Sequence, residues 1–346
     1  MSWYNTQGPD QNYVLFSKVR YIRNIAKQSF YHLADAKRSS EVFAKLESVL
    51  QKNGFRGEKL EPGATYALWA LAEKQLIESD IVNSEKPRFL YLNEPCNLIV
   101  ALGGENYITI SSIVAGSSVD EAKNMASGAE ELLDREIDFA YSENIGYLSP
   151  ICADCGSGLC FSAGLYLPSL RLADSQDMLR LDLSKKGLYL TPMFSGSAGD
   201  IYILSYVPHY LACEKDATAF FSHPVSYITE NESSALSSIL ANSSDILLNN
   251  ARRALGALIY SDFLSENELL GYLSEIRICH CLSTSTPDSL PSISALNYLC
   301  AEGLDYSVIV SSKEACSSDS DCNKARARLV SSYIKHKNEV DMSNGK

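Results

Sequence analysis

The stretch EIDFAYSENIGYLSPICADCGSGLCFSAGLYLPSL, residues 136–170, places three cysteines around a Gly-Ser-Gly turn just before an apolar segment. The cysteines are Cys152, Cys155 and Cys160. Glycines at this spacing favour a tight loop, and FSAGLYL has the composition of a buried strand. Such a loop is compatible with three interpretations: a metal site, a loop that carries a nucleophile, or the remnant of one.

The composition of the 346-residue chain, 46% hydrophobic and 21% charged, is typical of a globular protein. Its length indicates one large domain with a smaller one. The formal net charge of −12 argues against a nucleic-acid-binding protein, because neutralising phosphates requires clustered lysine and arginine.

The first residues, MSWYNTQGPDQNY, lack the basic start and apolar core of a secretory signal. No run of about 18 apolar residues predicts a membrane span. The ten cysteines are therefore expected to be reduced thiols rather than disulfides. These features predict a cytoplasmic protein that does not bind membranes.

Hydrophobic periodicity predicts both strands and helices in the first part of the chain. Residues 12–30 begin as a strand, and 88–114 read as hairpins interrupted at Gly103-Gly104. Further strands are expected at 159–167 and 200–207, and helices at 64–79 and 119–138. This order predicts an α+β fold in which an antiparallel sheet is flanked by helices.

The composition changes near residue 245, after which the periodicity is helical. Residues 283–292 form a polar Pro/Ser connection, and 293–337 read as further helices. Two capping boxes are expected at helix starts, one pairing Ser118 with Glu121 and the other Ser265 with Glu268. We predict a domain at 1–244 and a helical C-terminal domain at 245–346.

Four segments together resemble the ATP:guanido phosphotransferases, and among them the bacterial protein-arginine kinases. GPDQNYVLFSKVRYIRN resembles the family start that leads into Ser-Ser-Arg-x-Arg. ALAEKQLIES resembles the helix with Glu-x-His-Leu, and LIVALGGENYITIS the strand with Asn-Glu-Glu-Asp-His-Leu-Arg. Residues 136–170 resemble the block in which Gly-Tyr-Leu-Thr precedes a Cys-Pro-x-Asn-x-Gly-Thr-Gly-x-Arg loop. The cysteine-containing loop is therefore interpreted as the family's catalytic-cysteine loop in altered form.

This resemblance implies a fold and an activity. The family folds as an antiparallel sheet flanked by helices, binds ATP and Mg with a fan of arginines, and transfers the γ-phosphoryl group to a guanidinium. Such catalysis is mostly positioning and charge neutralisation. Residues 1–244 correspond to the guanido-kinase-like catalytic domain, and 245–346 to a regulatory and dimerisation domain.

The family's nucleotide-binding positions are only partly retained. Lys18 replaces the first arginine of the opening motif, Gln75 replaces the helix histidine, and Cys160 replaces the loop arginine. A further family arginine corresponds to Thr109. The positions that the resemblance assigns to the cofactor are Ser17, Lys18, Arg20, Gln75, Cys160 and Ser162.

Two candidate catalytic residues follow from the same resemblance. Glu105 retains one of the two carboxylates of the strand motif, the other position being Gly104. Cys152 lies one residue after the family cysteine, whose position is occupied by Ile151.

The C-terminal run DCNKARARLVSSYIK resembles the segment with which the family's regulatory domain binds phosphoarginine. The candidate phosphoarginine-binding residues are Lys324 and Arg326. The later family flap, Arg-Gly-x-x-Gly-Glu, corresponds to 184–199, which is about three residues short and contains neither arginine nor glutamate. Its nearest remnants are Lys186 and Gly187.

Three arginines of the phosphate fan are thus absent and a fourth is lysine. Each charge-assisted hydrogen bond contributes roughly 1.5–3 kcal/mol, so the loss is on the order of 4–9 kcal/mol before any compensation. We therefore interpret the chain as a degenerate kinase homologue that acts as a regulatory or scaffolding subunit, with weak or absent ATP and Mg binding, and that forms a homodimer or binds other proteins.

Two alternatives remain. One is an active kinase with a rearranged site, in which Lys18, Arg20 and either Arg23 or Lys186 bind the phosphates. The other is a zinc or thiol-redox module built from the Cys152/Cys155 pair and residues 279–281, Cys-His-Cys. The spacing of the second group is unusual for zinc, so we expect buried thiols and no metal.

Overall fold

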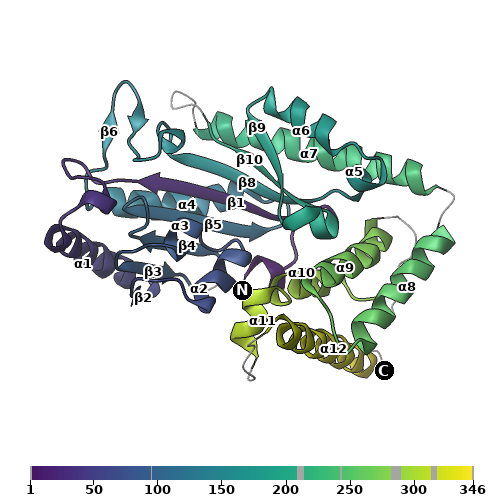
Figure 1. The fold of residues 1–346 in the computed structure, drawn as a ribbon. Coiled ribbons are helices and arrows are strands. Elements are labelled where there is room, and N and C mark those ends of the chain that lie inside the picture. The colour runs from purple at the N-terminus through teal and green to yellow at the C-terminus, as the bar shows by residue number, and fades with distance from the viewer. Residues whose placement is uncertain are drawn as a thin grey trace.

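An antiparallel sheet forms the centre of the computed structural model, which describes residues 2–94, 96–208, 214–241, 244–281, 290–312 and 318–344 (Figure 1). The sheet strands are β1 (Val14–Arg23), β2 (Arg56–Leu60), β3 (Arg88–Leu92), β4 (Leu98–Leu102), β5 (Ile108–Ala115), β8 (Leu159–Tyr166), β9 (Leu188–Pro192) and β10 (Ile201–Tyr206). Within the described residues their order is β2-β3-β4-β5-β1-β8-β10-β9. A separate hairpin pairs β6 (Tyr141–Ser142) with β7 (Gly146–Tyr147).

Helices surround this sheet. They are α1 (Ala36–Lys52), α2 (Tyr66–Glu73), α3 (Ser79–Val82), α4 (Val119–Asp134), α5 (Pro168–Leu172), α6 (Gln176–Ser184), α7 (Glu214–Leu240), α8 (Ser244–Tyr260), α9 (Glu266–Cys281), α10 (Ile293–Glu302), α11 (Asp305–Ser311) and α12 (Asp319–Asn344). The expected α+β fold, an antiparallel sheet flanked by helices, is confirmed.

Strand β1 is central and is buried along almost its whole length, although its sequence, VLFSKVRYIR, places serine, lysine and arginine among the apolar residues. Successive side chains of a strand point to opposite faces. Val19 and Tyr21 therefore face one side, and Lys18 and Arg20 face the other. This alternation separates a hydrophobic face from a face that carries charge.

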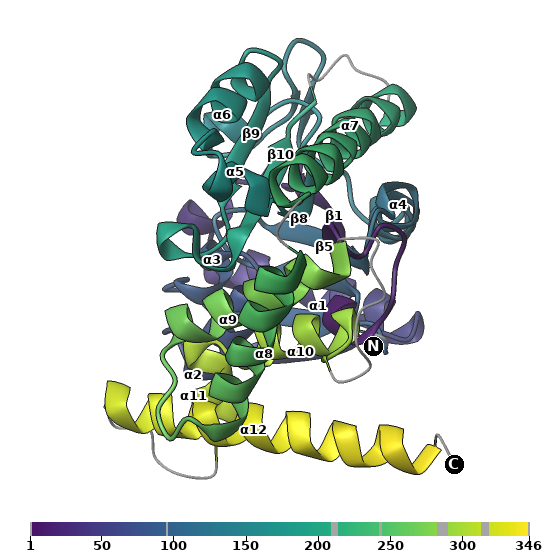
Figure 2. The same ribbon diagram turned by 90° about the vertical axis from the view of Figure 1, so that its right-hand side faces the viewer.

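The first face is covered by α1, α4 and α7. Buried side chains from these helices, such as Leu46, Ala126 and Phe221, pack in one cluster with Val19 and Tyr21. Figure 2 shows α4 and α7 on the same side of the sheet. Burial of this apolar area is the dominant favourable contribution to folding.

The C-terminal helices gather beside the other face, at one end of the sheet (Figure 1). Phe16 and Ile201 of the sheet share a second cluster with Leu269 and Leu299 of α9 and α10. At the start of α9, Ser265 and Glu268 form the expected capping box, with bonds of 2.9 Å from the Ser265 amide to Glu268 and 3.3 Å in the reverse direction. The helical region is thus packed onto the sheet through a common core.

The helix expected at 64–79 forms as α2 but ends at Glu73, and a turn follows it before α3 begins at Ser79. Gln75 in this turn has φ of +61°, a left-handed conformation that ends the helix. Leu76 and Ile77 are buried at 3% and 5% exposure, and the turn brings Glu78 against the sheet. Tertiary contacts of residues 76–78 therefore override the helical periodicity.

The helix expected at 119–138 is present, but its capping box is not. The hydroxyl of Ser118 donates to the carbonyl of Ala115, and its amide donates to the hydroxyl of Ser17. The side chain of Ser118 makes no capping bond to the helix. The chain entering α4 is fixed by β1 instead.

Two long helices, α1 and α7, were not predicted. Asp35 caps α1 by accepting from the amides of Lys37 and Arg38 at 2.9 and 3.2 Å. Helix α7 packs on the sheet and precedes the predicted domain division at 244/245, which remains a prediction. The polar connection expected at 283–292 lies mostly outside the described residues.

Throughout the described ranges, the helices are too short or too polar to cross a lipid bilayer.

Tyr166 connects the sheet to α9. Its hydroxyl lies 2.9 Å from both the carbonyl and the hydroxyl of Ser274. We predict that Tyr166→Phe lowers the free energy of unfolding by about 1–2 kcal/mol, because buried polar partners lose a hydrogen bond. Urea denaturation measures this change. The matched variant Tyr141→Phe, at a position 58% exposed, should alter stability by less than about 0.5 kcal/mol, and an equal effect of both would contradict the role of Tyr166.

Candidate functional site

The charged face of β1 forms the floor of the candidate site. Lys18 lies opposite Ser162 of β8, which in turn lies opposite Ser205 of β10. Arg20 lies opposite Cys160. Side chains of residues that lie directly opposite each other on neighbouring strands point to the same face of the sheet, so these five side chains share one surface.

Two neutral side chains occupy the positions to which the sequence resemblance assigns family arginines. Thr109 of β5 pairs with Ile22, two residues beyond Arg20 on the same face, and is 5% exposed. The Cys160 thiol lies 3.9 Å from the Ser162 hydroxyl, and burial raises the pKa of Cys160. The strand register therefore places Thr109 and Cys160 on the same face as Arg20, on the two strands that neighbour β1.

Glu78 neutralises the two cations of the floor. Its carboxylate lies 2.7 Å from Lys18 Nζ and 3.4 Å from Arg20, while Lys18 also donates to the Gln75 carbonyl at 2.8 Å. The Lys18 side chain is only 7% exposed. Burial alone raises the pKa of a carboxyl, but Lys18 and Arg20 outweigh it and lower the pKa of Glu78 to about 2. Glu78 is thus ionised at neutral pH.

Arg20 lies between two carboxylates. One guanidinium nitrogen is 3.4 Å from Glu78, and the other is 3.9 Å from Asp154. Burial opposes the charge of Arg20, but Glu78, Cys160 and Asp154 together raise its pKa above the ordinary value. For Asp154, burial raises the pKa and Arg20 lowers it only in part. The floor and its rim are therefore close to electrically balanced without any ligand.

Glu105 and Cys152 lie on exposed loops at the rim. Glu105 is in the turn between β4 and β5, where its amide donates to Asp80 at 3.2 Å. Cys152 is exposed at the start of a short 3-10 helix that ends at Asp154. Neither side chain contacts Arg20 in the described structure.

Residues 37–235, more than half of the chain, match the family model of the ATP:guanido phosphotransferase C-terminal catalytic domain. The chain belongs to this family. Its fold, an antiparallel sheet flanked by helices, agrees with that membership.

Protein-arginine kinases are similar along most of their length. The protein-arginine kinase of Bacillus cereus (strain ATCC 10987 / NRS 248) is 27% identical over 290 residues, covering 80% of this chain and 80% of the relative. That of Halothermothrix orenii is 26% identical over 282 residues, covering 80% and 81%.

Solved guanidino kinases have a similar fold. The duplicated taurocyamine kinase from Schistosoma mansoni, with transition-state analogue components, superposes with a TM-score of 0.59 at 17% identity. The match covers 73% of this chain and 39% of that longer chain. A lombricine kinase gives a TM-score of 0.53 at 16% identity, with coverage of 66% and 68%.

The guanido phosphotransferases use ATP, so ATP and magnesium are the expected ligands. A triphosphate would bind to the cations of the floor, but Lys18 and Arg20 already pair with an internal carboxylate. Magnesium takes oxygen ligands, and the Asp154 and Glu78 carboxylates face Arg20. In this arrangement the residues present do not fit a magnesium triphosphate.

Two other basic or polar residues of the opening motif have structural roles. The hydroxyl of Ser17, fully buried, donates to the Gly116 carbonyl at 2.8 Å on the opposite face of the sheet from Lys18. Arg23, 1% exposed, pairs with Glu130 at 2.8 Å, and its guanidinium lies 3.5 Å from the centre of the Tyr147 ring. Neither side chain is available to bind a phosphate.

Arg23 also binds the backbone of the cysteine-containing loop. It donates to the carbonyls of Ser157 and Gly158 at 3.2 and 3.3 Å. Gly158 has φ of +58°, and a Cβ atom there would lie 2.5 Å from the Arg23 guanidinium and 2.7 Å from the Ile22 carbonyl. The second glycine of the Gly-Ser-Gly turn is thus required by packing.

The thiols expected to be free of metal contact protein groups. Cys155 Sγ lies 3.4 Å from the Ser149 amide and 3.3 Å from its carbonyl. Cys279 and Cys281 are buried, and His280 lies 2.9 Å from the carbonyl of Pro291. The described ranges contain no group of three or more His, Cys, Asp or Glu side chains arranged to hold a metal ion.

The structure does not bring the two candidate phosphoarginine-binding residues together. Arg326 is fully buried and donates to the carbonyls of Gly303 and Leu264 at 2.6 and 2.8 Å. Lys324 instead lines a cavity of about 530 Å³ with Arg328. Arg326 therefore stabilises the helical region, and Lys324 faces outward.

The segment expected to replace the family flap, 184–199, forms the edge strand β9 and the turn after it. Lys186 is exposed in the tight turn before β9. Gly199 in the later turn packs on Leu270 of α9. This segment therefore adds a strand and contacts the C-terminal region, and it brings no cation to Arg20.

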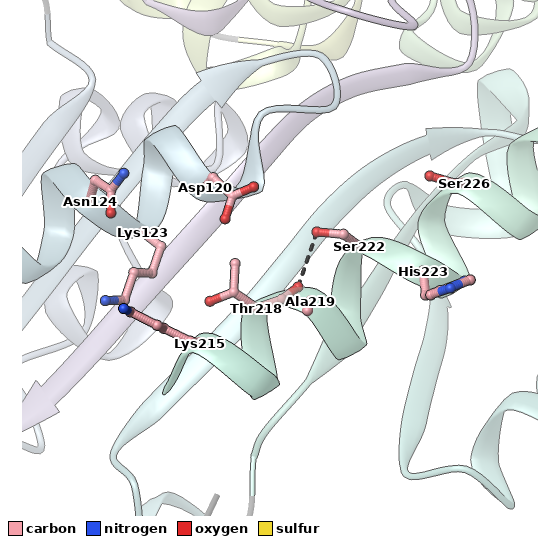
Figure 3. Close-up of a pocket in the computed structure, with 9 residues that line it drawn as sticks. All are labelled: Asp120, Lys123, Asn124, Lys215, Thr218, Ala219, Ser222, His223 and Ser226. Atoms are coloured by element: carbon pink, nitrogen blue, oxygen red, sulfur yellow. Dashed lines mark hydrogen bonds between the residues drawn. The ribbon is translucent and has the colours of Figure 1, made fainter. Parts of the chain in front are cut away.

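A cavity of about 650 Å³ lies between α4 and α7 (Figure 3). Its lining includes Lys123, Lys215 and His223. Because α4 and α7 cover the hydrophobic face of the sheet, this cavity is on the opposite side from Lys18 and Arg20.

Sequence reasoning missed the acidic partners of the site, Glu78 and Asp154. Both occupy segments that carried the family resemblance, and Asp154 stands at the asparagine position of the loop motif. An acidic side chain in a phosphate-binding motif was the available signal for Asp154. Glu78 required knowledge of the turn at Gln75.

Glu73 was also missed, and it joins the catalytic region to α11. Its carboxylate accepts from the amides of Tyr306 and Ser307, both at 3.1 Å. The pKa of Glu73 is raised to about 7. Burial is the largest cause and Glu266 adds to it, while the two amide hydrogen bonds oppose the shift. The protonated form is therefore favoured by the fold.

We predict a pH-dependent stability that Glu73→Gln removes. The folded pKa of Glu73 is above its ordinary value of 4.5, so the folded chain binds the proton more tightly. The contribution of Glu73 to the free energy of unfolding is fully present below about pH 4.5 and is lost as the pH rises through about 7. Thermal melts from pH 4.5 to 8 should show the native protein losing stability relative to Glu73→Gln, and parallel curves would contradict the assignment.

Proposed function

We propose that this guanido phosphotransferase homologue is a degenerate protein-arginine kinase, retained as a regulatory or scaffolding subunit in the cytoplasm. The observation that supports this proposal best is the pairing of Lys18 and Arg20 with Glu78. The neutral side chains of Thr109 and Cys160 on the same face add to it.

The electrostatic argument concerns desolvation. A triphosphate carries several negative charges, and their transfer from water is unfavourable unless cations and hydrogen-bond donors replace the solvent. Lys18 and Arg20 together match only the charges of Glu78 and Asp154. In-line transfer also depends on fixed alignment of the γ-phosphoryl group, which several arginine forks provide in a phosphate fan.

A second candidate function is an active protein-arginine kinase with a rearranged site. It is favoured by the exposure of Glu105 and Cys152 at the rim and by the partial exposure of Arg20, at 23%. In this function Glu105 holds the substrate guanidinium and Cys152 takes the position of the family cysteine.

We predict that MgATP binds the native protein very weakly and that arginine phosphorylation is far below that of an intact protein-arginine kinase. Isothermal titration calorimetry with MgATP measures the first, and phosphoarginine mass spectrometry on a protein substrate measures the second. Micromolar binding with turnover that Glu105→Gln or Cys152→Ala abolishes would establish the active alternative.

Restoring the family arginines should strengthen nucleotide binding. We predict that Thr109→Arg with Cys160→Arg raises MgATP affinity by about tenfold or more, since each charge-assisted bond contributes roughly 1.5–3 kcal/mol. Thr109→Gln with Cys160→Gln introduces long side chains without charge and is the matched control. Equal affinities of the two double variants would show that these positions do not face the phosphates.

We further propose that the chain forms a homodimer through its helical C-terminal region. Ile246 and Tyr260, at the two ends of α8, are 62% and 80% exposed, so each end of this helix offers a large apolar side chain to a partner surface. A self-complementary surface is typical of twofold symmetric dimers.

Sedimentation velocity tests this association. We predict a dimer for the native chain and a shift toward monomer for Ile246→Glu with Tyr260→Glu, because charges would be buried at the interface. Ile145→Glu, at a position 49% exposed in the β6–β7 hairpin, is the control and should remain dimeric. A native monomer at high concentration would contradict the proposal.

A further inference from the structure

Residues 73–78 connect the C-terminal helices to the two cations of the floor. At one end, Glu73 accepts from the Tyr306 and Ser307 amides of α11, and also from the Ser307 hydroxyl at 3.3 Å. At the other end, Glu78 pairs with Lys18 and Arg20. A segment of only six residues therefore carries both contacts.

The end at Glu73 is held by further contacts with the C-terminal region. Lys74 pairs with Glu302 of α10 at 2.8 Å, with both side chains less than a fifth exposed. Trp69 of α2 stacks on Tyr306 with ring centres 5.6 Å apart. The position of α2 thus depends on the docking of α10 and α11.

The residues that precede Glu78 are held in place by burial and by a hydrogen bond to Lys18. Leu76 and Ile77 are buried, and the carbonyl of Gln75 accepts from Lys18 at 2.8 Å. The left-handed turn at Gln75 directs the chain back toward the sheet. Because the segment from Glu73 to Glu78 is short and its middle is buried, we expect a displacement of Glu73 to move Glu78 as well.

We propose that Glu78 is an internal competitor for a phosphoryl anion at Lys18 and Arg20, and that docking of α10 and α11 on Glu73 and Lys74 positions it there. When this docking is released, Glu78 leaves the two cations and they bind an external phosphoryl group. This inference rests on the proposed function, because it explains how a site with few cations is regulated. Glu78 competes directly, and Glu73 is a positioning residue.

Linkage gives the proposal a second consequence. If undocking of α11 raises the affinity for an anion, the anion must favour undocking by the same factor. Anion binding at Lys18 and Arg20 should therefore increase amide hydrogen exchange in residues 305–311, although α11 is not part of the anion site.

The first experiment measures the competition at the two cations, with inorganic tripolyphosphate as the probe and calorimetry on the full chain. Glu78→Gln should raise its affinity by about tenfold or more, because one charged partner is removed from each cation. Adding Arg20→Gln to Glu78→Gln should abolish the gain. Glu61→Gln, at an exposed glutamate that pairs with Lys59 away from the floor, is the matched control and should bind as the native chain does.

The second experiment measures the coupling. Glu73→Ala should raise tripolyphosphate affinity toward that of Glu78→Gln, whereas Glu73→Gln, which keeps an acceptor for α11, should restore most of the native behaviour. Hydrogen exchange of residues 305–311 in the native chain, with and without saturating tripolyphosphate, tests the reciprocal effect without any change at Glu73. The same measurement on Glu78→Gln is the control and should show no increase, because the internal competitor is absent.

The outcomes separate the claims. Unchanged affinity in Glu78→Gln overturns the competition, and unchanged exchange at 305–311 on anion binding to the native chain overturns the coupling. Tight MgATP binding with turnover in the native chain contradicts the proposed function itself, whichever result the coupling experiments give.

Discussion

Two cations side by side on a buried central strand are the constraint around which this structure is built. Lys18 and Arg20 are two residues apart on one face of β1, between the sheet and the α2–α3 turn. Buried charges without partners are strongly destabilising. Glu78, which immediately precedes α3, and Asp154, which lies in the cysteine-containing loop, satisfy this requirement and connect two distant segments to the central strand.

Much of the fold was predictable because the signals are local. The apolar composition of 159–167 and the Gly103-Gly104 interruption were sufficient for β8 and the β4–β5 hairpin. The break at Gln75 was not predictable, since residues 64–79 have good helical periodicity and the turn is stabilised by Lys18, some 57 positions away. The capping box at Ser118 failed for a similar reason, because Ser17 is its hydrogen-bond partner.

The candidate site was predictable only in its positions. The motifs selected Lys18, Arg20 and Cys160 as nucleotide-binding candidates, and the strand register places the three on one face of the sheet. The motifs that carried the resemblance assign no role to position 78, so the pairing of Glu78 with both cations had no sequence signal. The same limit applied to Arg326, whose motif position suggested a ligand but whose side chain is wholly enclosed.

Gly158 has a consequence for how such sequences are interpreted. Its left-handed backbone and its contact with Arg23 require glycine whatever chemistry the loop performs. A search that treats the Gly-x-Gly signature as a mark of enzymatic activity would therefore count architecture as catalysis. In this fold, the second glycine of the signature is retained because it packs against Arg23 and the Ile22 carbonyl, whether or not the chain transfers a phosphoryl group.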